Sequence, residues 1–141
     1  MADKIILLDT DFAFELLHKN EDAENFIELN NYSIIAISSI TFYEMIKSCI
    51  NKTQLINLRK QLPQFFYPIP VEVEISNLTG NLLSTYHLSH DLKINDAFIA
   101  ATAIYYDIEF ATCNTKHFQF IPTLLLAKHN VKPSRKGGSL F

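Results

Sequence analysis

Residues 96–112 read DAFIAATAIYYDIEFAT, and this stretch joins a helical pattern directly to a strand pattern. The segment 96–106 predicts a helix that is rich in alanine, and its small side chains allow it to lie close against a sheet. Residues 108–112 follow after a single aspartate and predict a short strand. A helix that leads straight into a strand is typical of α/β proteins with a parallel sheet.

The rest of the chain repeats this alternation of short apolar runs and helical patterns. We expect strands at 5–8, 33–38, 65–70, 108–112 and 123–127. We expect helices at about 10–19, 20–30, 40–50, 53–62, 71–86 and 96–106, with Thr10 or Asp11 capping the first and Pro63 ending the fourth. The fold class is therefore α/β with a mostly parallel sheet of four to five strands.

Composition restricts the function classes. The 141 residues are 48% apolar and 19% charged, with a net charge of −3, so nothing predicts a disordered chain or a globally basic nucleic-acid binder. No run approaches the roughly 20 apolar residues of a membrane span. Two cysteines and an N-terminus unlike a signal peptide favour a cytoplasmic protein with no membrane association. We expect one domain, residues 1–127, and a basic, mobile C-terminal tail, residues 128–141.

Polar residues follow the predicted strands. Asp9 ends the first strand, Glu44 lies in the helix after the second, and Asp96 opens the helix before the strand at 108–112. Thr112 and Asn114 come directly after that strand. Because ligands of parallel α/β sheets bind at the carboxyl ends of the strands, we expect these side chains to converge on one edge.

Each carboxylate also has an ordinary structural interpretation. Thr41 and Glu44 fit a capping box, Asp96 suits a helix N-terminus, and Asp9 suits a polar strand end. Taken together, three carboxylates need a compensating cation or raised pKa values, since two charges about 4 Å apart repel by about 4 kcal/mol at an effective dielectric of 20. Mg²⁺ or Mn²⁺ suits a site built only from oxygen ligands.

Three segments carry a family resemblance: LLDTDFAFELL, AISSITFYEMIKS and LKINDAFIAATAIYYDIEFATCNTKHFQFIP. In this order they resemble the signatures of PIN-domain ribonucleases, and most of all the VapC-type toxins of bacterial toxin–antitoxin pairs. The resemblance covers about residues 5–127. It implies a three-layer α/β/α sandwich and an endoribonuclease that depends on Mg²⁺ or Mn²⁺ and often cleaves structured RNA such as tRNA. It also implies a cognate antitoxin partner and a homodimer.

The resemblance assigns roles to the polar residues. Asp9 and Asp96 match the direct metal ligands, and Glu44 matches a group that positions metal or attacking water. Asn114 falls where the family often has a fourth polar or acidic residue, and Thr112 is expected to orient Asp9 or the substrate phosphate. Two departures stand out, both visible in the sequence: Asp11 replaces the usual asparagine of the first motif, and Asn114 carries no charge.

Two other functions remain open at this point. Asp9 and Asp11 mimic the Asp-x-Asp start of haloacid-dehalogenase-like phosphatases, in which the first carboxylate is the nucleophile. That family requires a flap before the first helix, whereas this chain enters a helical pattern at once. The second alternative is a PIN-like module that has lost catalysis and only binds RNA or a protein.

Overall fold

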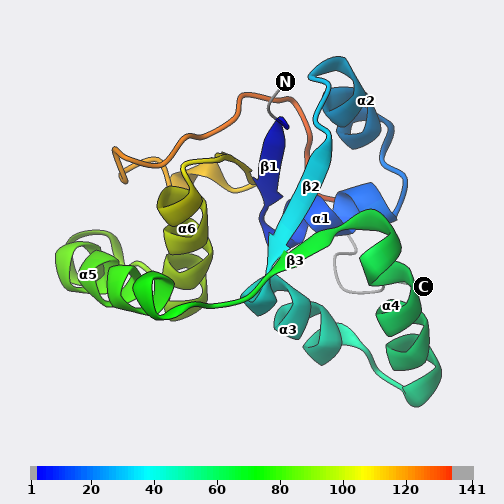
Figure 1. Cartoon of the computed structure of the whole chain (residues 1–141), viewed down its shortest axis with the longest axis horizontal. Coiled ribbons are helices and arrows are strands. Elements are labelled where there is room, and N and C mark those ends of the chain that lie inside the picture. Colours follow the sequence, from blue (N-terminus) through cyan, green and yellow to red (C-terminus); the bar gives the residue numbers. More distant parts are fainter. Residues whose placement is uncertain (1–2, 135–141) are drawn as a thin grey trace.

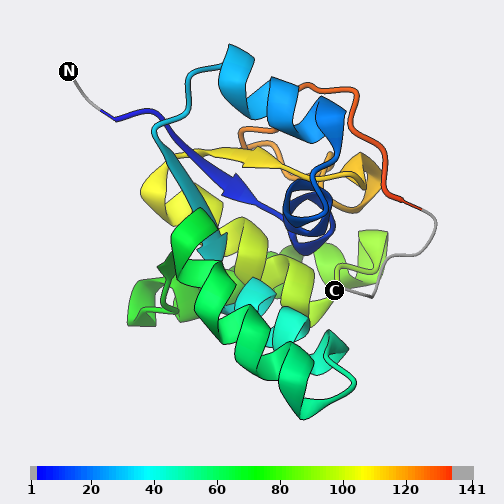
Figure 2. The same ribbon diagram turned by 90° about the vertical axis from the view of Figure 1, so that its right-hand side faces the viewer.

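The computed structural model describes residues 3–134 and consists of a sheet with helices on both faces (Figures 1 and 2). In chain order the elements are β1 Ile5–Leu8, α1 Thr10–Leu17, α2 Glu21–Leu29, β2 Ile34–Ser38, α3 Ser39–Ser48, α4 Lys52–Phe65, β3 Tyr67–Ile69, α5 Val73–His90, α6 Ile94–Tyr106, β4 Glu109–Ala111 and the 3₁₀ turn η1 Thr115–His117.

The sheet has the strand order β3-β2-β1-β4, and every pairing is parallel. In the central pairings, Leu7 of β1 lies opposite Ala36 of β2 on one side and Phe110 of β4 on the other. Parallel strands have their carboxyl ends at one edge, so the residues that follow β1, β2 and β4 meet there. The predicted α/β fold with a parallel sheet is confirmed.

Two hydrophobic cores cover the two faces of this sheet. Side chains alternate along β1, so Leu7 packs into one core while Ile6 and Leu8 pack into the other. Helices α5 and α6 close the face of Leu7, and α1, α2 and α4 close the opposite face (Figure 1). This is the three-layer arrangement that the family resemblance implied.

Helix α6 packs as its composition predicts. Its buried residues include four alanines that are at most 1% exposed: Ala97, Ala100, Ala101 and Ala103. Ile99 and Thr102 of the same helix are also fully buried. This tight packing fixes α6 against the sheet and thereby fixes the position of Asp96 in the first turn of the helix.

The expected end of α4 and the expected strand at 123–127 were wrong. Pro63 does not end α4, which continues to Phe65. The proline costs the helix one backbone donor, but the neighbouring Leu62 and Phe66 remain packed in the core and hold the helix together. Residues 123–127 do not form a strand. A single parallel bridge joins Leu126 to Phe110, so the sheet has four strands among the described residues.

Residues 128–134, the first half of the segment predicted as a tail, contact the core in this structure. Val131 is only 5% exposed, and the His129 ring packs edge-on against Phe12 and Phe26 of the core. A single apolar residue such as Val131 forms no periodic pattern in the sequence, so its burial was not predicted. The remaining tail residues lie outside the described part of the chain. Within residues 3–134, no helix has the length and apolar character that crossing a bilayer requires.

Candidate active site

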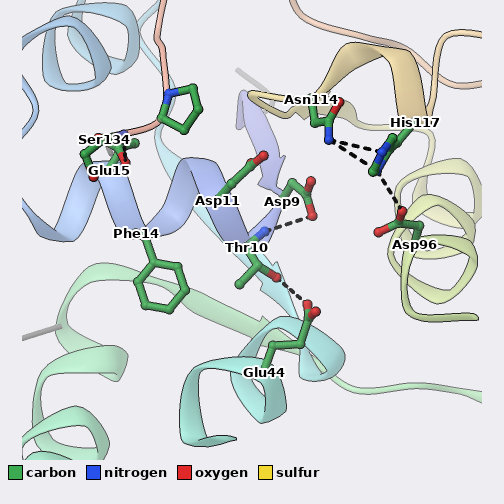
Figure 3. A pocket seen from close by; sticks show the side chains of 11 residues that line it. Asp9, Thr10, Asp11, Phe14, Glu15, Glu44, Asp96, Asn114, His117 and Ser134 are labelled. Atoms are coloured by element: carbon green, nitrogen blue, oxygen red, sulfur yellow. Dashed lines mark hydrogen bonds and ion pairs between the residues drawn. The ribbon is translucent and has the colours of Figure 1, made fainter. Parts of the chain in front are cut away.

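A cavity of about 410 Å³ opens at the carboxyl edge of the sheet (Figure 3). Its walls come from α1, α3, α6, the turn after β4 and the C-terminal segment. The lining residues are Asp9, Thr10, Asp11, Phe14, Glu15, Glu44, Asp96, Asn114, His117, Pro133 and Ser134. The cavity thus collects the three carboxylates that the sequence placed on this edge.

Both carboxylate oxygens of Asp9 accept hydrogen bonds. It follows the last residue of β1 and is the N-cap of α1, a role that we had expected for Thr10 or Asp11. Its Oδ1 accepts a 2.9 Å hydrogen bond from the backbone N–H of Thr10, and its Oδ2 accepts one of 2.8 Å from the Thr112 hydroxyl. With both oxygens held and 7% of the residue exposed, Asp9 has a defined orientation.

Burial determines the electrostatics of Asp9. It raises the pKa of this carboxyl to about 8, and the neighbouring charge of Asp11 acts in the same direction, while the hydrogen bonds from Thr112 and Thr10 oppose them. A carboxyl with this pKa binds a proton at neutral pH unless a cation compensates its charge. The chain therefore places a carboxylate where its charge is costly.

Glu44 does not cap its helix. Helix α3 is capped by Ser38, whose hydroxyl accepts from the backbone N–H of Ile40, so the capping-box interpretation of Glu44 was wrong. Instead, Glu44 Oε1 accepts a 2.5 Å hydrogen bond from the Thr10 hydroxyl, and Oε2 lies 3.4 Å from the Asn95 amide nitrogen. These contacts hold Glu44 toward the cavity and join α3 to α1 and α6.

Asp96 lies in the first turn of α6 and makes no capping bond there. Its Oδ2 is 3.4 Å from Nδ1 of His117, which belongs to the turn after β4. Burial raises the pKa of Asp96, His117 opposes this shift, and the charge of Glu44 adds to it. Figure 3 shows Asp96 across the cavity from Asp9, with His117 beside it.

Thr112 and Asn114 occupy different positions relative to the carboxylates. The Thr112 hydroxyl donates to Asp9 and accepts a 3.0 Å hydrogen bond from the backbone N–H of Asn114. The Asn114 side-chain amide nitrogen lies 3.2 Å from His117 Nε2. Asn114 therefore lines the cavity and contacts Asp96 indirectly, through His117.

Asp11 and Glu15 also face this cavity; the sequence left the role of Asp11 open and gave Glu15 none. Asp11 accepts a 3.1 Å hydrogen bond from the backbone N–H of Cys113, and burial raises its pKa. Glu15 is 3% exposed and accepts from the Asn20 amide at 3.0 Å and from the backbone N–H of Ser134 at 2.8 Å. A usable signal was present, because residues 11 and 15 are one turn apart on the same face of α1.

Comparison with known proteins assigns the family. The family model of the PIN domain matches residues 6–121. The chain belongs to the PIN-domain family. This PIN domain is similar to Ribonuclease VapC19 of Mycobacterium tuberculosis, with 29% identity over 121 residues that cover 84% of this chain and 95% of the relative.

Solved structures agree with this assignment. VapBC2 from Rickettsia felis, bound to a DNA fragment from its promoter, includes a chain with 27% identity and a TM-score of 0.72; the match covers 89% of this PIN domain and 99% of that chain. A toxin–antitoxin complex from Klebsiella pneumoniae gives 28% identity and a TM-score of 0.69, over 87% and 96% of the two chains.

The phosphatase alternative does not fit this PIN domain. Helix α1 begins at Thr10, directly after Asp9, so the chain has no room for a flap between the first strand and the first helix. The carboxylate that a phosphatase would use as nucleophile is instead a helix cap with both oxygens engaged. Asp9 and Asp11 therefore do not form the local catalytic pair that their spacing suggested.

The donor set of the cavity fits a hard divalent cation. The carboxylates of Asp9, Asp11 and Asp96 face the same space in Figure 3. Among the described residues, no three side chains of His, Cys, Asp or Glu are close enough to form a ready-made ligand group. Mg²⁺ commonly keeps several waters and takes only one or two carboxylates directly, so the cavity suits this ion better than a fully protein-enclosed metal.

Proposed function

We propose that this PIN domain is an endoribonuclease that requires Mg²⁺ or Mn²⁺ and cleaves RNA phosphodiester bonds. The observation that carries this proposal is the convergence of Asp9, Glu44 and Asp96, from three separate elements, on one cavity. The similarity to a ribonuclease of Mycobacterium tuberculosis supports the same reaction. Structured RNA such as tRNA is the substrate class that we propose, and the cytoplasm is the proposed location.

The residues of the cavity have separate tasks in this mechanism. Asp9 and Asp96 would hold the cation, which when bound lowers the pKa of a water and offsets the charge of the phosphodiester. Thr112 keeps Asp9 oriented, and Thr10 keeps Glu44 directed at the cavity. Glu44 is placed to accept a proton from the attacking water, and we propose this as its role.

His117 and Asn114 contribute to the wall beside Asp96. His117 pairs with the Asp96 carboxylate, and the Asn114 amide lies against the other ring nitrogen of His117. We propose that this group orients Asp96 and contacts the substrate at the cavity mouth. Because Asn114 is uncharged, the carboxylates available to a cation would be those at the N-cap of α1 and on α1, α3 and α6.

A matched pair of variants on one helix tests this function. Asp96→Asn removes a charge at the first turn of α6, and Asp107→Asn makes the same change at the exposed C-cap of that helix. We expect Asp96→Asn to abolish cleavage of total RNA in Mg²⁺, and Asp107→Asn and wild type to cleave equally. EDTA should stop both active proteins. Wild-type cleavage rates in Asp96→Asn would refute the site, and an inactive wild type that binds RNA would favour the non-catalytic alternative.

We further propose that the protein is the toxin of a toxin–antitoxin pair, bound by a cognate antitoxin and assembled as a homodimer. The structures from Rickettsia felis and Klebsiella pneumoniae, which contain similar chains together with antitoxins, support this. Expression alone should arrest growth, and coexpression with the protein encoded by the adjacent reading frame should relieve it and give a stable complex. Unchanged growth with the protein expressed alone would contradict the toxin assignment.

A further inference from the structure

His129 lies outside the predicted site, yet both of its ring nitrogens are engaged. Nε2 is 2.7 Å from the carbonyl oxygen of Thr112, and Nδ1 is 3.0 Å from the backbone nitrogen of Val131. A carbonyl oxygen only accepts and a backbone N–H only donates. These two partners match the tautomer with its hydrogen on Nε2, which donates to Thr112.

The core fixes the plane of this ring. His129 packs edge-on against Phe12 and Phe26, with ring centroids 4.9 and 5.5 Å away. Val131, two residues further along, is buried in the same core. The direction of the Nε2–H bond is thus set by packing and not by a freely rotating side chain.

The acceptor of this hydrogen bond belongs to a peptide that also contacts the cavity. The carbonyl of Thr112 and the N–H of Cys113 are the two ends of one peptide unit, and that N–H donates to Asp11 Oδ1 at 3.1 Å. Because the peptide is planar, holding its oxygen also fixes the direction of its N–H. A donor on the carbonyl further polarises the peptide and strengthens the bond to Asp11.

The same residue reaches the second carboxylate through its side chain. The Thr112 hydroxyl donates to Asp9 Oδ2 at 2.8 Å, and Thr112 is 1% exposed. His129 is therefore linked to Asp11 through the peptide and to Asp9 through the threonine side chain. These two carboxylates, one at the N-cap and one in the first turn of α1, both line the cavity.

We propose that His129 is a positioning residue of this site, and this inference rests on the proposed nuclease function. It holds the Thr112–Cys113 peptide so that Asp9 keeps the orientation in which it would bind a divalent cation, with Asp11 fixed beside it at the cavity wall. The segment 128–134 therefore contributes to the site through His129. A second anchor, between buried Glu15 and the N–H of Ser134, keeps the end of this segment at the cavity wall.

Two substitutions of His129 separate its hydrogen bond from its packing. His129→Phe keeps an aromatic ring against Phe12 and Phe26 but removes the donor to Thr112, together with the acceptor of the Val131 N–H. His129→Gln keeps an amide donor near the position of Nε2 but removes the ring. A role in packing alone would affect the glutamine variant more, whereas a positioning role would affect the phenylalanine variant more.

The decisive readout is Mn²⁺ binding by the 141-residue chain, measured from the electron paramagnetic resonance signal of free Mn²⁺. We expect His129→Phe to bind Mn²⁺ about 10- to 100-fold more weakly than wild type, the usual effect of removing a partner that orients metal ligands. His129→Gln should stay within about threefold of wild type despite a lower melting temperature. At saturating Mn²⁺, kcat of His129→Phe should return toward wild type with KM for RNA unchanged.

The outcomes separate this inference from the proposed function. Equal Mn²⁺ affinity in all three proteins, or weaker binding in the glutamine variant alone or in both variants equally, would overturn the role of His129. If wild type bound Mn²⁺ without cleaving RNA, the proposed nuclease function would be overturned. The Mn²⁺ affinities of the three proteins would still decide whether His129 is a positioning residue. A wild type that binds no Mn²⁺ would overturn both.

Discussion

Replacing Asp9 by asparagine should stabilise the metal-free protein at neutral pH. Asp9→Asn keeps the shape of the side chain: its oxygen can still accept from the Thr10 N–H, and its amide can donate to the Thr112 hydroxyl oxygen. What it removes is a carboxyl whose pKa burial raises to about 8. The variant therefore tests the cost of the buried charge with little change in packing.

The sign and size of the effect follow from proton linkage. The folded carboxyl, with a pKa of about 8, binds more protons than the unfolded one, with its ordinary value of 3.8, so raising the pH between these values destabilises the folded state. Each pH unit in this window costs up to about 1.4 kcal/mol. Between pH 5 and pH 7, wild type should lose up to about 3 kcal/mol relative to Asp9→Asn.

Urea unfolding in EDTA at several pH values measures this difference. The other ionisable groups are common to both proteins, so subtracting the two curves gives the effect of Asp9 together with its influence on Asp11 and Asp96. The control Asp107→Asn should run parallel to wild type. Adding Mg²⁺ at pH 7 should stabilise wild type and leave Asp9→Asn unchanged, since a ligand stabilises only the state that binds it. A difference between wild type and Asp9→Asn that stays constant from pH 5 to pH 7 would refute the argument.

Three other predictions concern the surroundings of the cavity and the core. Burial acts to raise the pKa of Glu15, but hydrogen bonds from Ser134 and Asn20 outweigh it and lower the pKa. The stability that ionised Glu15 contributes should therefore be lost as the pH falls below about 4.5. In urea unfolding, Glu15→Gln should lose less stability than wild type over this pH range. Burial, followed by the charge of Asp11, raises the pKa of Cys113 to about 12. In a Cys49→Ser background, iodoacetamide at pH 8 should therefore modify the Cys113 thiol about 1,000-fold more slowly in the folded protein than in the unfolded one. Equal rates would contradict this. In α4, Leu58→Ala should cost about 2–5 kcal/mol in chemical unfolding because Leu58 is 1% exposed, whereas Ile56→Ala, at a residue 47% exposed, should cost less than about 1 kcal/mol.

The sheet and its helices were predictable because their signals are local. The apolar run of β1 and the alanine-rich pattern of α6 each specify an element through neighbouring residues alone. The errors arose where a distant contact overrides a local rule. Pro63 stays inside α4 because core packing holds its neighbours, and Val131 is buried although nothing near it in sequence predicts a core contact.

The residues of the candidate site were also only partly predictable from the sequence. Asp9, Glu44 and Asp96 were predictable as neighbours because one rule, that parallel strands end at a common edge, places all three. The contacts of Asp11 and Glu15 were not, since their partners Cys113 and Ser134 are 102 and 119 residues away in the chain. No periodicity or motif connects residues at such separations; only the folded backbone does.

The charge of the cavity explains why these distant contacts exist. Its lining residues include five carboxylates and, within the described part of the chain, no lysine or arginine. Burial raises the pKa values of Asp9, Asp11 and Asp96, so the metal-free fold carries unfavourable charge at this edge. Neutral donors offset part of that cost: the hydroxyls of Thr10 and Thr112 and the N–H of Cys113. Because these donors are uncharged, they orient the carboxylates without cancelling their charge, and this leaves the cavity attractive to a divalent cation.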